Sequence, residues 1–515
     1  MAEAARRLAP RKHVVQVDDL RGKRIVTFER GEARVLIQAR RIDWPDPGQT
    51  AVRVTMRTPV AGSSFSVPMA EATVFLANVS LERETAKPTP LRNPRPANWT
   101  KPDIYPDRLF QGRLLQSVNH VFQWGEDGLD YEIVVPSRAE AVRATRFPLF
   151  SVWPLTMDGV SSGIGLWHSL EKFNGVLTLP FRARCIRFLA SVIPEGARLR
   201  AYLRITAQNP RSYVADVLVS DGRGRLVMTA SGWEELICPV TPPVHRLVQR
   251  PSDTFLTQEL PPALLGDVSM PVRGSMIAQV PHGIFEGQQE LWLKAVAFAL
   301  LNPAERDEWL DMRGVVSRRI EWLLGRACVK DALRRHLLEQ HQQNWAATDI
   351  PIWIDDSGKP HPLGAWQDRT RETVDISIAH TSGLVAAAIA VNGRIGIDLE
   401  RIGRDLTDDF SRSVFTPEEQ ELAAQSGEGP TTLLRFWCAK EALAKALGTG
   451  IRYSPSDLRT RAIDVGTGRL ELELAGQWLD AFRPLQGRAM PVNTSLLEDH
   501  ILATCVIPAA LLPPP

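Results

Sequence analysis

The stretch RFWCAKEALAKALGTG, residues 435–450, decides how the C-terminal part of this chain folds. Its alanines and leucines favour a helix, for which Gly448 is a suitable C-cap. Glu441 and Lys445 are four residues apart, so a helix places both side chains on one face. Such a pair is commonly a solvated surface pair worth about 0.2–0.5 kcal/mol. A function for it therefore requires further groups nearby.

A strand with two acidic residues precedes this helix in the chain. In GRIGIDLE, residues 393–400, apolar residues alternate with Gly396, Asp398 and Glu400. A strand places both carboxylates on one face, where they repel each other unless a cation lies between them. A site with oxygen ligands and no sulfur favours Mg²⁺. Glu441 would complete this acidic cluster.

A third motif, SIAHTSG at residues 377–383, ends an apolar strand in a turn. It offers the imidazole of His380, the hydroxyls of Thr381 and Ser382, and accessible backbone N–H groups. This combination suits phosphate oxygens. Taken alone, His380 is equally well explained as an ordinary turn histidine.

In this order, VDISIAHTSG, GRIGIDLE, VFTPEEQELA and RFWCAKEALAKALG resemble the surfactin-type 4′-phosphopantetheinyl transferases, over residues 285–510. The resemblance implies two similar α/β halves with pseudo-twofold symmetry and coenzyme A, the co-substrate, in the cleft between them. It implies Mg²⁺ on the coenzyme's pyrophosphate, held by Asp398, Glu400 and Glu441. The expected reaction transfers 4′-phosphopantetheine to a serine of an acyl carrier protein or carrier domain of a polyketide or fatty-acid synthase.

The resemblance also assigns roles to individual side chains. Lys445 would neutralise charge on the phosphates, and Glu441 or Glu400 would accept the serine proton. The candidates for binding the coenzyme are His380, Thr381, Arg318, Arg319 and Lys440. The family's usual Ser-His-Ser reads Ala379-His380-Thr381 here, so one hydroxyl contact differs. The two arginines suit the coenzyme's 3′-phosphate, because guanidinium groups match phosphate geometry.

Basic residues crowd one predicted helical segment in this part of the chain. They are Arg318, Arg319, Arg326, Lys330, Arg334 and Arg335. Such a surface would help an acidic carrier protein to dock. A solvated basic helix face explains most of them equally well.

Residues 14–237 form a different territory, in which short alternating runs predict antiparallel strands and one helix over 161–173. The phrases DRLFQGRLLQSVNHVFQWGEDGLDYEI and FPLFSVWPLTMDGVSSGIGLWHSL resemble the second half of a polyketide synthase dehydratase, a double hot dog. In that family an aspartate acts with a histidine of the first half, and Asp158 matches the aspartate. The histidine is absent, and the related HGP turn reads Gly112 after Gln111.

Two explanations remain open for this territory, a scaffold or carrier-docking surface and one part of a split 3-hydroxyacyl dehydratase. A homodimer formed through the hot dog domain is also left open. Asp158 alone would equally serve as a helix-capping residue. The expected fold class is therefore α+β, with a possibly incomplete hot dog domain at 14–237, a Pro-rich linker at 238–284 and the transferase domain at 285–510.

Composition excludes several other classes of protein. The formal net charge of +2 gives no field strong enough to predict nucleic-acid binding. Five widely spaced cysteines fit reduced thiols in the cytoplasm. No secretory signal or membrane-spanning run is present, so we expect a cytoplasmic protein without a membrane partner.

The order of the two territories resembles the C-terminal end of enediyne-type iterative synthases. No carrier-protein D-S-L motif lies in a suitable helix, so we expect the acceptor serine on another chain. The competing hypothesis is a catalytically inactive subunit that binds acyl carriers. Three carboxylates with Lys445 argue against it, because a docking surface has no use for a repulsive acidic cluster.

Overall fold

The computed structural model describes residues 1–26, 28, 30–59, 65–78, 81–137, 150, 152, 154–171, 176–190, 192–266, 270–278, 289–381 and 383–511. The chain divides into two units, Met1–His245 and Arg246–Pro515, and each is described by itself. Both units mix helices with antiparallel sheets, so the predicted α+β class is confirmed.

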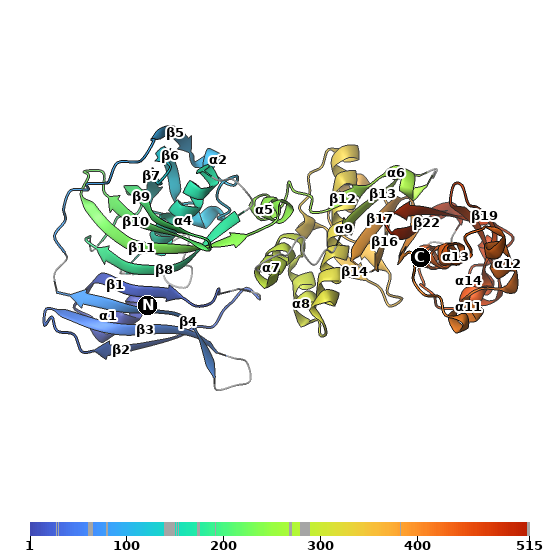
Figure 1. The fold of residues 1–515 in the computed structure, drawn as a ribbon, viewed down its shortest axis with the longest axis horizontal. Coiled ribbons are helices and arrows are strands. Elements are labelled where there is room, and N and C mark those ends of the chain that lie inside the picture. Colours follow the sequence, from blue (N-terminus) through green and yellow to red (C-terminus); the bar gives the residue numbers. More distant parts are fainter. Residues whose placement is uncertain are drawn as a thin grey trace. The chain divides into compact units, whose positions relative to one another are not determined.

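The first unit is built on one antiparallel sheet of eleven strands (Figure 1), in the order β2-β3-β4-β1-β8-β11-β10-β9-β7-β6-β5. The strands are β1 (His13–Gly22), β2 (Leu36–Ile42), β3 (Gln49–Pro59), β4 (Ser66–Ala77), β5 (Arg95–Thr100), β6 (Val118–Gly125), β7 (Gly128–Val134), β8 (Val176–Phe188), β9 (Arg198–Asn209), β10 (Ser212–Ser220) and β11 (Leu226–Pro239). Its helical segments are α1 (Ala2–Leu8), α2 (Lys101–Ile104), η1 (Arg113–Leu115), α4 (Pro154–Glu171) and α5 (Pro242–Gln249), and α5 crosses the unit boundary.

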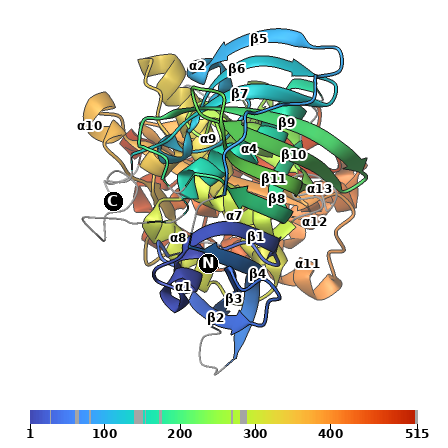
Figure 2. The ribbon, with the colours of Figure 1, turned by 90° about the vertical axis from the view of Figure 1, so that its left-hand side faces the viewer.

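Helix α4 lies in the curve of strands β6 to β11, as Figures 1 and 2 show. It confirms the helix predicted at 161–173 but begins earlier, and Phe173 lies outside the described residues. A glycine permits this packing, because a Cβ on Gly163 would lie 2.6 Å from the Tyr131 hydroxyl oxygen. Trp167 Nε1 donates a hydrogen bond to the carbonyl of Gly125, at 3.0 Å.

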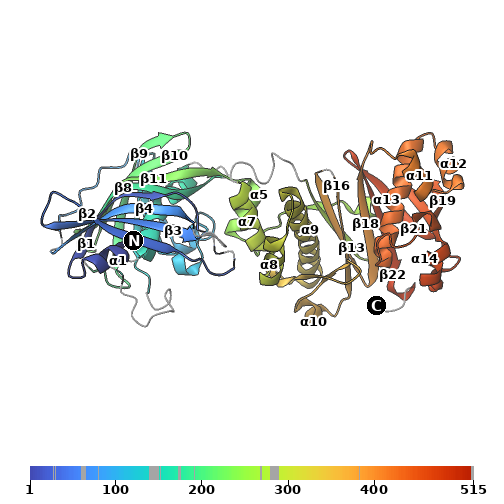
Figure 3. The same cartoon turned by 90° about the horizontal axis from the view of Figure 1, so that it is seen from below.

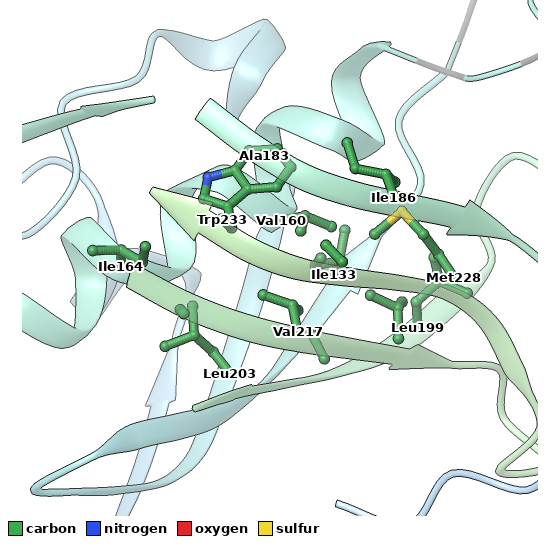
Figure 4. Close-up of a cluster of buried hydrophobic side chains, with 14 of the residues drawn as sticks. Ile133, Val160, Ile164, Ala183, Ile186, Leu199, Leu203, Val217, Met228 and Trp233 are labelled. Carbon is green, nitrogen blue, oxygen red and sulfur yellow. The ribbon is translucent and has the colours of Figure 1, made fainter. Parts of the chain in front are cut away.

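The core of the first unit fills the space between α4 and the sheet. Figure 4 shows side chains of α4, such as Val160 and Ile164, beside residues from several strands, such as Ile133 and Val217. All of these side chains are buried. Burying apolar area is the main contribution to holding the helix in the curve of the sheet.

The second unit contains two larger antiparallel sheets and a two-stranded ribbon. The first sheet has the order β12-β13-β17-β16, and the second has the order β18-β22-β21-β20-β19. The strands are β12 (Gln258–Leu260), β13 (Val272–Ala278), β14 (Ile352–Ile354), β15 (Pro360–Pro362), β16 (Val374–Thr381), β17 (Leu384–Val391), β18 (Gly393–Arg401), β19 (Leu458–Asp464), β20 (Arg469–Leu474), β21 (Met490–Leu497) and β22 (His500–Pro508).

One long helix packs on each sheet of this unit. Figure 3 shows α9 beside β13 and β16, and α13 beside β18 and β21. The helices are α6 (Pro262–Leu265), α7 (Gln289–Leu300), α8 (Pro303–Asp311), α9 (Val316–His341), α10 (Trp366–Thr370), α11 (Asp408–Val414), α12 (Pro417–Gln425), α13 (Gly429–Leu447) and α14 (Gly476–Ala481). Four short 3₁₀ turns, η2 (Ala347–Asp349), η3 (Pro455–Asp457), η4 (Arg483–Leu485) and η5 (Ala509–Leu511), complete the described elements.

Side chains of β16 join the two sheets where β16 lies beside β18. Asp375 Oδ2 accepts a hydrogen bond from the Ile395 backbone N–H, at 2.8 Å. Ser377 Oγ accepts one from the Ile397 N–H, at 3.0 Å. Because these side chains satisfy the edge of β18, the end of β16 is fixed next to the acidic part of β18.

In the first half of this unit, a buried ion pair connects α8 to α9. Asn302 and Glu305 form a capping box at the start of α8. Glu305 Oε2 lies 2.6 Å from Lys330 Nζ on α9, and both side chains are buried. The other carboxylate oxygen accepts from the Ile352 N–H, at 3.0 Å. The carboxylate is thus hydrogen-bonded on both oxygens.

The second half repeats this arrangement on α12 and α13. Thr416 and Glu419 form the capping box that starts α12. Glu419 Oε2 lies 2.8 Å from the buried Lys440 Nζ on α13, and Oε1 accepts from the Thr460 N–H at 2.7 Å. The same cap, ion pair and strand contact in both halves, each with a long helix on a sheet, are the features expected of pseudo-twofold halves.

Part of the segment interpreted as a linker is folded. Strand β13 is an interior strand of its sheet and pairs with β17 from Val272 to Ala278. The Pro-rich linker expected at 238–284 is therefore partly a sheet strand, because Pro271 stands just before β13, where no ladder donor is lost. The domain boundaries themselves stay a prediction. Among the described helices, none has the length and apolar character needed to cross a bilayer.

We expect Lys440→Met to destabilise the second unit strongly, because it leaves the Glu419 carboxylate buried without its cation. The free energy of unfolding should fall by about 3–5 kcal/mol. Denaturant unfolding of the full chain measures this change. The matched control is Arg461→Ala, which breaks the exposed pair with Glu473 and should cost less than about 1 kcal/mol. Equal costs for the two variants would contradict the structural role of the buried pair.

Candidate active site

A close approach between β18 and α13 creates the site. A Cβ on Gly396 would lie 1.9 Å from the carbonyl oxygen of Ala442 and 2.4 Å from the backbone nitrogen of Ala446. Only glycine permits this spacing, since real Cβ atoms do not approach backbone atoms so closely. The acidic strand residues after Gly396 therefore lie within reach of the α13 side chains.

Asp398 is the most buried of the three predicted metal ligands. Its Oδ1 lies 2.8 Å from Lys445 Nζ, and the Lys445 ammonium also donates to the carbonyl of Ile397, at 3.1 Å. Its Oδ2 is buried without a hydrogen-bond partner among the described residues. A buried carboxylate oxygen without a hydrogen-bond partner lowers the stability of the fold unless a ligand binds to it.

Glu400 is held by two donors on the same side of β18. Trp437 Nε1 on α13 donates to Glu400 Oε1, at 3.0 Å. Arg404 Nη1 forms an ion pair with the same oxygen. The tryptophan that precedes Lys440 and Glu441 in the sequence thus orients a carboxylate of the neighbouring strand. Sequence reasoning did not identify the role of Trp437 or of Arg404.

Glu441 completes the acidic group from α13. Burial raises the pKa of Glu441, and the Asp398 carboxylate raises it further, while Lys445 and Arg404 act in the opposite direction. Burial alone would lower the pKa of Lys445, but the carboxylates of Asp398 and Glu441 outweigh it, so this pKa is raised. These groups therefore act on one another electrostatically.

The three carboxylates come from the two elements expected to bring them together. In the described part of the chain they are not a group whose ligand oxygens all lie within 4.8 Å of one another. Lys445 and Arg404 lie against two of them instead. The oxygen-only donor set and the unpartnered Asp398 Oδ2 fit Mg²⁺, which takes one or two protein carboxylates and keeps sites for water and phosphate.

His380 lies between two cavities of the second unit. It lines a cavity of about 760 Å³ together with Arg318, Arg326, Lys359 and Lys445, among others. It also lines a second cavity of about 860 Å³, with Thr381, Asp398, Glu400, Arg401 and Arg404. His380 Nδ1 lies 3.6 Å from Glu321 Oε2. The predicted coenzyme residues His380 and Thr381 thus border the acidic group, and Ser382 lies outside the described residues.

Arg326 is a further candidate for anion binding in the first of these cavities, the one of about 760 Å³. It is 5% exposed and lies over the Trp322 ring, with its guanidinium carbon 3.8 Å from the ring centroid. Its Nε and Nη2 are buried without hydrogen-bond partners among the described residues. A buried guanidinium with unused donors beside a cavity favours a phosphate ligand. In the sequence Arg326 is one of several arginines on this helix, and nothing there distinguishes it from the others.

The structure corrects two of the predicted coenzyme contacts. Lys440 is fully buried and donates to Glu419 and to two backbone carbonyls, so its ammonium reaches neither cavity. The guanidinium of Arg319 lies over the Trp309 ring at 4.2 Å, and Arg319 does not line the first cavity as Arg318 does.

The basic helix is mostly not a docking surface or a solvated face. Of its six basic residues, only Arg318 is exposed. Lys330 is buried against Glu305, and Arg334 is buried against Asp331 at 3.0 Å. Lys330 and Arg334 therefore form ion pairs inside the fold and are not presented to a partner.

In the first unit, Asp158 lines a separate cavity of about 290 Å³. Burial raises the pKa of Asp158 to about 6, and its Oδ2 has no hydrogen-bond partner among the described residues. Glu235 lines the same cavity, and burial raises its pKa to about 8. Gln111, at the position of the missing HGP turn, donates to Ser162 Oγ at 3.0 Å. Asp158 is thus directed at a cavity that contains a second protonatable carboxyl group.

Comparisons with known proteins show the class to which the second unit belongs. Residues 394–505 match the 4′-phosphopantetheinyl transferase superfamily. A holo-[acyl-carrier-protein] synthase of Cereibacter sphaeroides is 37% identical over 115 residues, 21% of this chain and 83% of the relative. One of Dinoroseobacter shibae is 33% identical over 127 residues, 23% of this chain and 91% of the relative. The chain belongs to the 4′-phosphopantetheinyl transferase superfamily and is a transferase enzyme.

Residues 88–234 match a different family, the polyketide synthase dehydratase N-terminal domain. This match confirms the dehydratase-like hot dog fold of the first unit. The dehydratase domain from the CurF module of curacin polyketide synthase aligns with 46% of this chain and 81% of its own, at 13% identity and a TM-score of 0.36. A trans-acyltransferase polyketide synthase enoyl-isomerase aligns with 45% and 85%, at 15% identity and a TM-score of 0.33.

Glu441→Gln should increase stability at neutral pH. Because the folded-state pKa of Glu441 is raised above 4.5, the folded chain binds this proton more tightly than the unfolded chain. The free energy of unfolding therefore falls as the pH rises from 4.5 through the folded-state pKa, where Glu441 becomes ionised. We expect the variant to be more resistant to denaturant at about pH 7–8, with the gain disappearing below pH 4.5. Denaturant titrations without Mg²⁺ at several pH values measure this, and a pH-independent effect like that of the exposed control Glu421→Gln would contradict it.

Proposed function

We propose that the second unit transfers the 4′-phosphopantetheine group of coenzyme A to a serine of an acyl carrier protein, in a Mg²⁺-dependent reaction. The observation that carries the proposal is the buried Asp398 Oδ2 without a partner, beside Lys445 and Glu441 and next to a large cavity with basic residues. Phosphoryl transfer needs mainly positioning and charge neutralisation, which these residues supply.

In the proposed reaction, the carrier serine oxygen forms a bond to the β-phosphorus of coenzyme A. The bond from that phosphorus to the bridging oxygen breaks, and adenosine 3′,5′-bisphosphate leaves. Glu441 or Glu400 accepts the serine proton. Asp398, Glu400 and Glu441 would hold Mg²⁺, which would supply positive charge to the pyrophosphate.

The remaining residues bind and orient the substrates. Lys445 contacts the pyrophosphate from α13, while Arg326 and Arg318 bind the coenzyme's 3′-phosphate in the first cavity. His380 separates this cavity from the second one, which we assign to the carrier protein. Arg401 and Arg404 line that second cavity and would attract the acidic surface of a carrier.

The repeated buried Lys–Glu pairs support the two-half, surfactin-type architecture for this unit. The relation of this chain to the C-terminal end of enediyne-type iterative synthases stays a prediction. A homodimer formed through the first unit and a cytoplasmic location are also predictions. A polyketide or fatty-acid synthase carrier is the proposed partner, because the first unit has the fold of a synthase dehydratase.

The transferase proposal predicts specific losses of activity. With fluorescent coenzyme A, Mg²⁺ and an apo acyl carrier protein, we expect Asp398→Asn and Glu441→Gln each to lower the rate of carrier labelling by about 10²-fold or more. Arg326→Ala should mainly raise the KM for coenzyme A, because it removes a binding contact. In-gel fluorescence measures the rate.

The exposed variant Glu421→Gln is the control and should label carriers at the wild-type rate. Labelling that persists in the Asp398→Asn, Glu441→Gln double variant would show that the site is wrong. Carrier binding without labelling by the wild-type chain would favour the inactive carrier-binding subunit.

A second function is favoured by the cavity at Asp158. Its carboxyl group, with a pKa of about 6, is suited to exchange a proton with a bound 3-hydroxyacyl thioester. We expect water loss from a 3-hydroxyacyl carrier to fall by about 10²-fold in Asp158→Asn and to be unchanged in the exposed control Asp107→Asn. Mass spectrometry of the acyl carrier measures this. No water loss with the wild-type chain is expected of a scaffold, and equally of one part of a split dehydratase whose histidine lies on another chain.

A further inference from the structure

Two histidines and a glutamate meet in the second unit, outside both cavities described above. His336 and His341 lie in the last turns of α9, and Glu372 lies just before β16. One ligand atom from each residue lies within 4.8 Å of the other two, which among the described residues is the arrangement best suited to a metal ion. None of these residues takes part in the proposed transfer reaction.

Both imidazoles direct the same ring nitrogen to one carboxylate. His336 Nε2 lies 2.7 Å from Glu372 Oε2, and His341 Nε2 lies 3.0 Å from Glu372 Oε1. The two rings are 5.7 Å apart between centroids and are inclined by 71°. His336 is 5% exposed, so the group is closed to solvent on one side.

His341 approaches the same carboxylate from the last turn of α9, with its buried Nε2 3.0 Å from Glu372 Oε1. Around a tetrahedral Zn²⁺ with bonds of about 2.0–2.1 Å, ligand atoms are separated by roughly 3.3 Å. The observed separations of 2.7 and 3.0 Å, which run to the two different oxygens of Glu372, are shorter than that value by roughly 0.3–0.6 Å.

We infer that His336, His341 and Glu372 bind one Zn²⁺ ion, with water as the fourth ligand. Two neutral imidazoles and one carboxylate form a donor set that suits Zn²⁺ better than Mg²⁺, which prefers oxygen. The bound ion connects the C-terminal end of α9 to the start of β16. Helix α9 carries Arg326, and β16 carries His380 next to its last residue, so the ion stabilises the frame of the coenzyme cavity without contacting the substrates.

The test uses the full-length chain, stripped of metal with a chelator and then titrated with Zn²⁺ against a chromophoric competitor. We expect one Zn²⁺ per chain at this site and a higher melting temperature in its presence. His341→Ala, at the partly exposed end of α9, and Glu372→Gln should each weaken Zn²⁺ binding at least about tenfold and remove the thermal shift.

Two control variants separate this site from others. His361→Ala removes a histidine that also pairs with a carboxylate, Asp355 at 2.8 Å, but without a second histidine, and it should bind Zn²⁺ normally. Asp398→Asn removes the acidic site and should also leave this binding unchanged. Zn²⁺ binding that survives both His341→Ala and Glu372→Gln, or that is absent from the wild-type chain, would overturn the inference and leave an ordinary histidine–carboxylate cluster.

Discussion

The contact between Gly396 and the backbone of α13 is the constraint on which the site depends. A strand normally lies farther from a helix that packs on it, because side chains separate the two backbones. At Gly396 no side chain intervenes, and a Cβ there would lie 1.9 Å from the Ala442 carbonyl oxygen. The Asp398–Lys445 and Glu400–Trp437 contacts both bridge this same pair of elements. Their geometry follows from how closely the backbones approach.

The rest of the second unit holds β18 and α13 against the half that contains α9. The buried Lys330–Glu305 and Lys440–Glu419 pairs each tie a long helix to a short capped helix, once in each half. A buried pair of this kind contributes little net stability but is costly to break, so it specifies one arrangement. The cavity proposed for coenzyme A is lined by α9 and β16 from one half and by Lys445 from the other. A coenzyme there would need both halves in place.

Local patterns in the sequence predicted the elements and the reactive residues, because alternation and helical spacing are properties of neighbouring residues. The strand with Asp398 and Glu400 and the helix with Glu441 and Lys445 formed as expected. The partner that each lysine or arginine contacts in the fold could not be predicted in this way. Lys440 is neutralised by Glu419, twenty-one residues away, and β13 exists because it pairs with the distant β17. Such partners are chosen by tertiary packing, which spacing along the chain does not encode.

Lys445 connects the acidic group to the coenzyme cavity, and its electrostatics explain why the site can be held ready before substrate binds. Burial raises the pKa of Glu441, and repulsion from the Asp398 carboxylate raises it further. Lys445 and Arg404 offset this repulsion, and the raised pKa of Lys445 keeps its ammonium group charged. The same ammonium lines the cavity proposed for coenzyme A. A cation fixed by the protein's own carboxylates needs little reorganisation to stabilise a phosphate, and preorganised charge of this kind is a large part of catalysis.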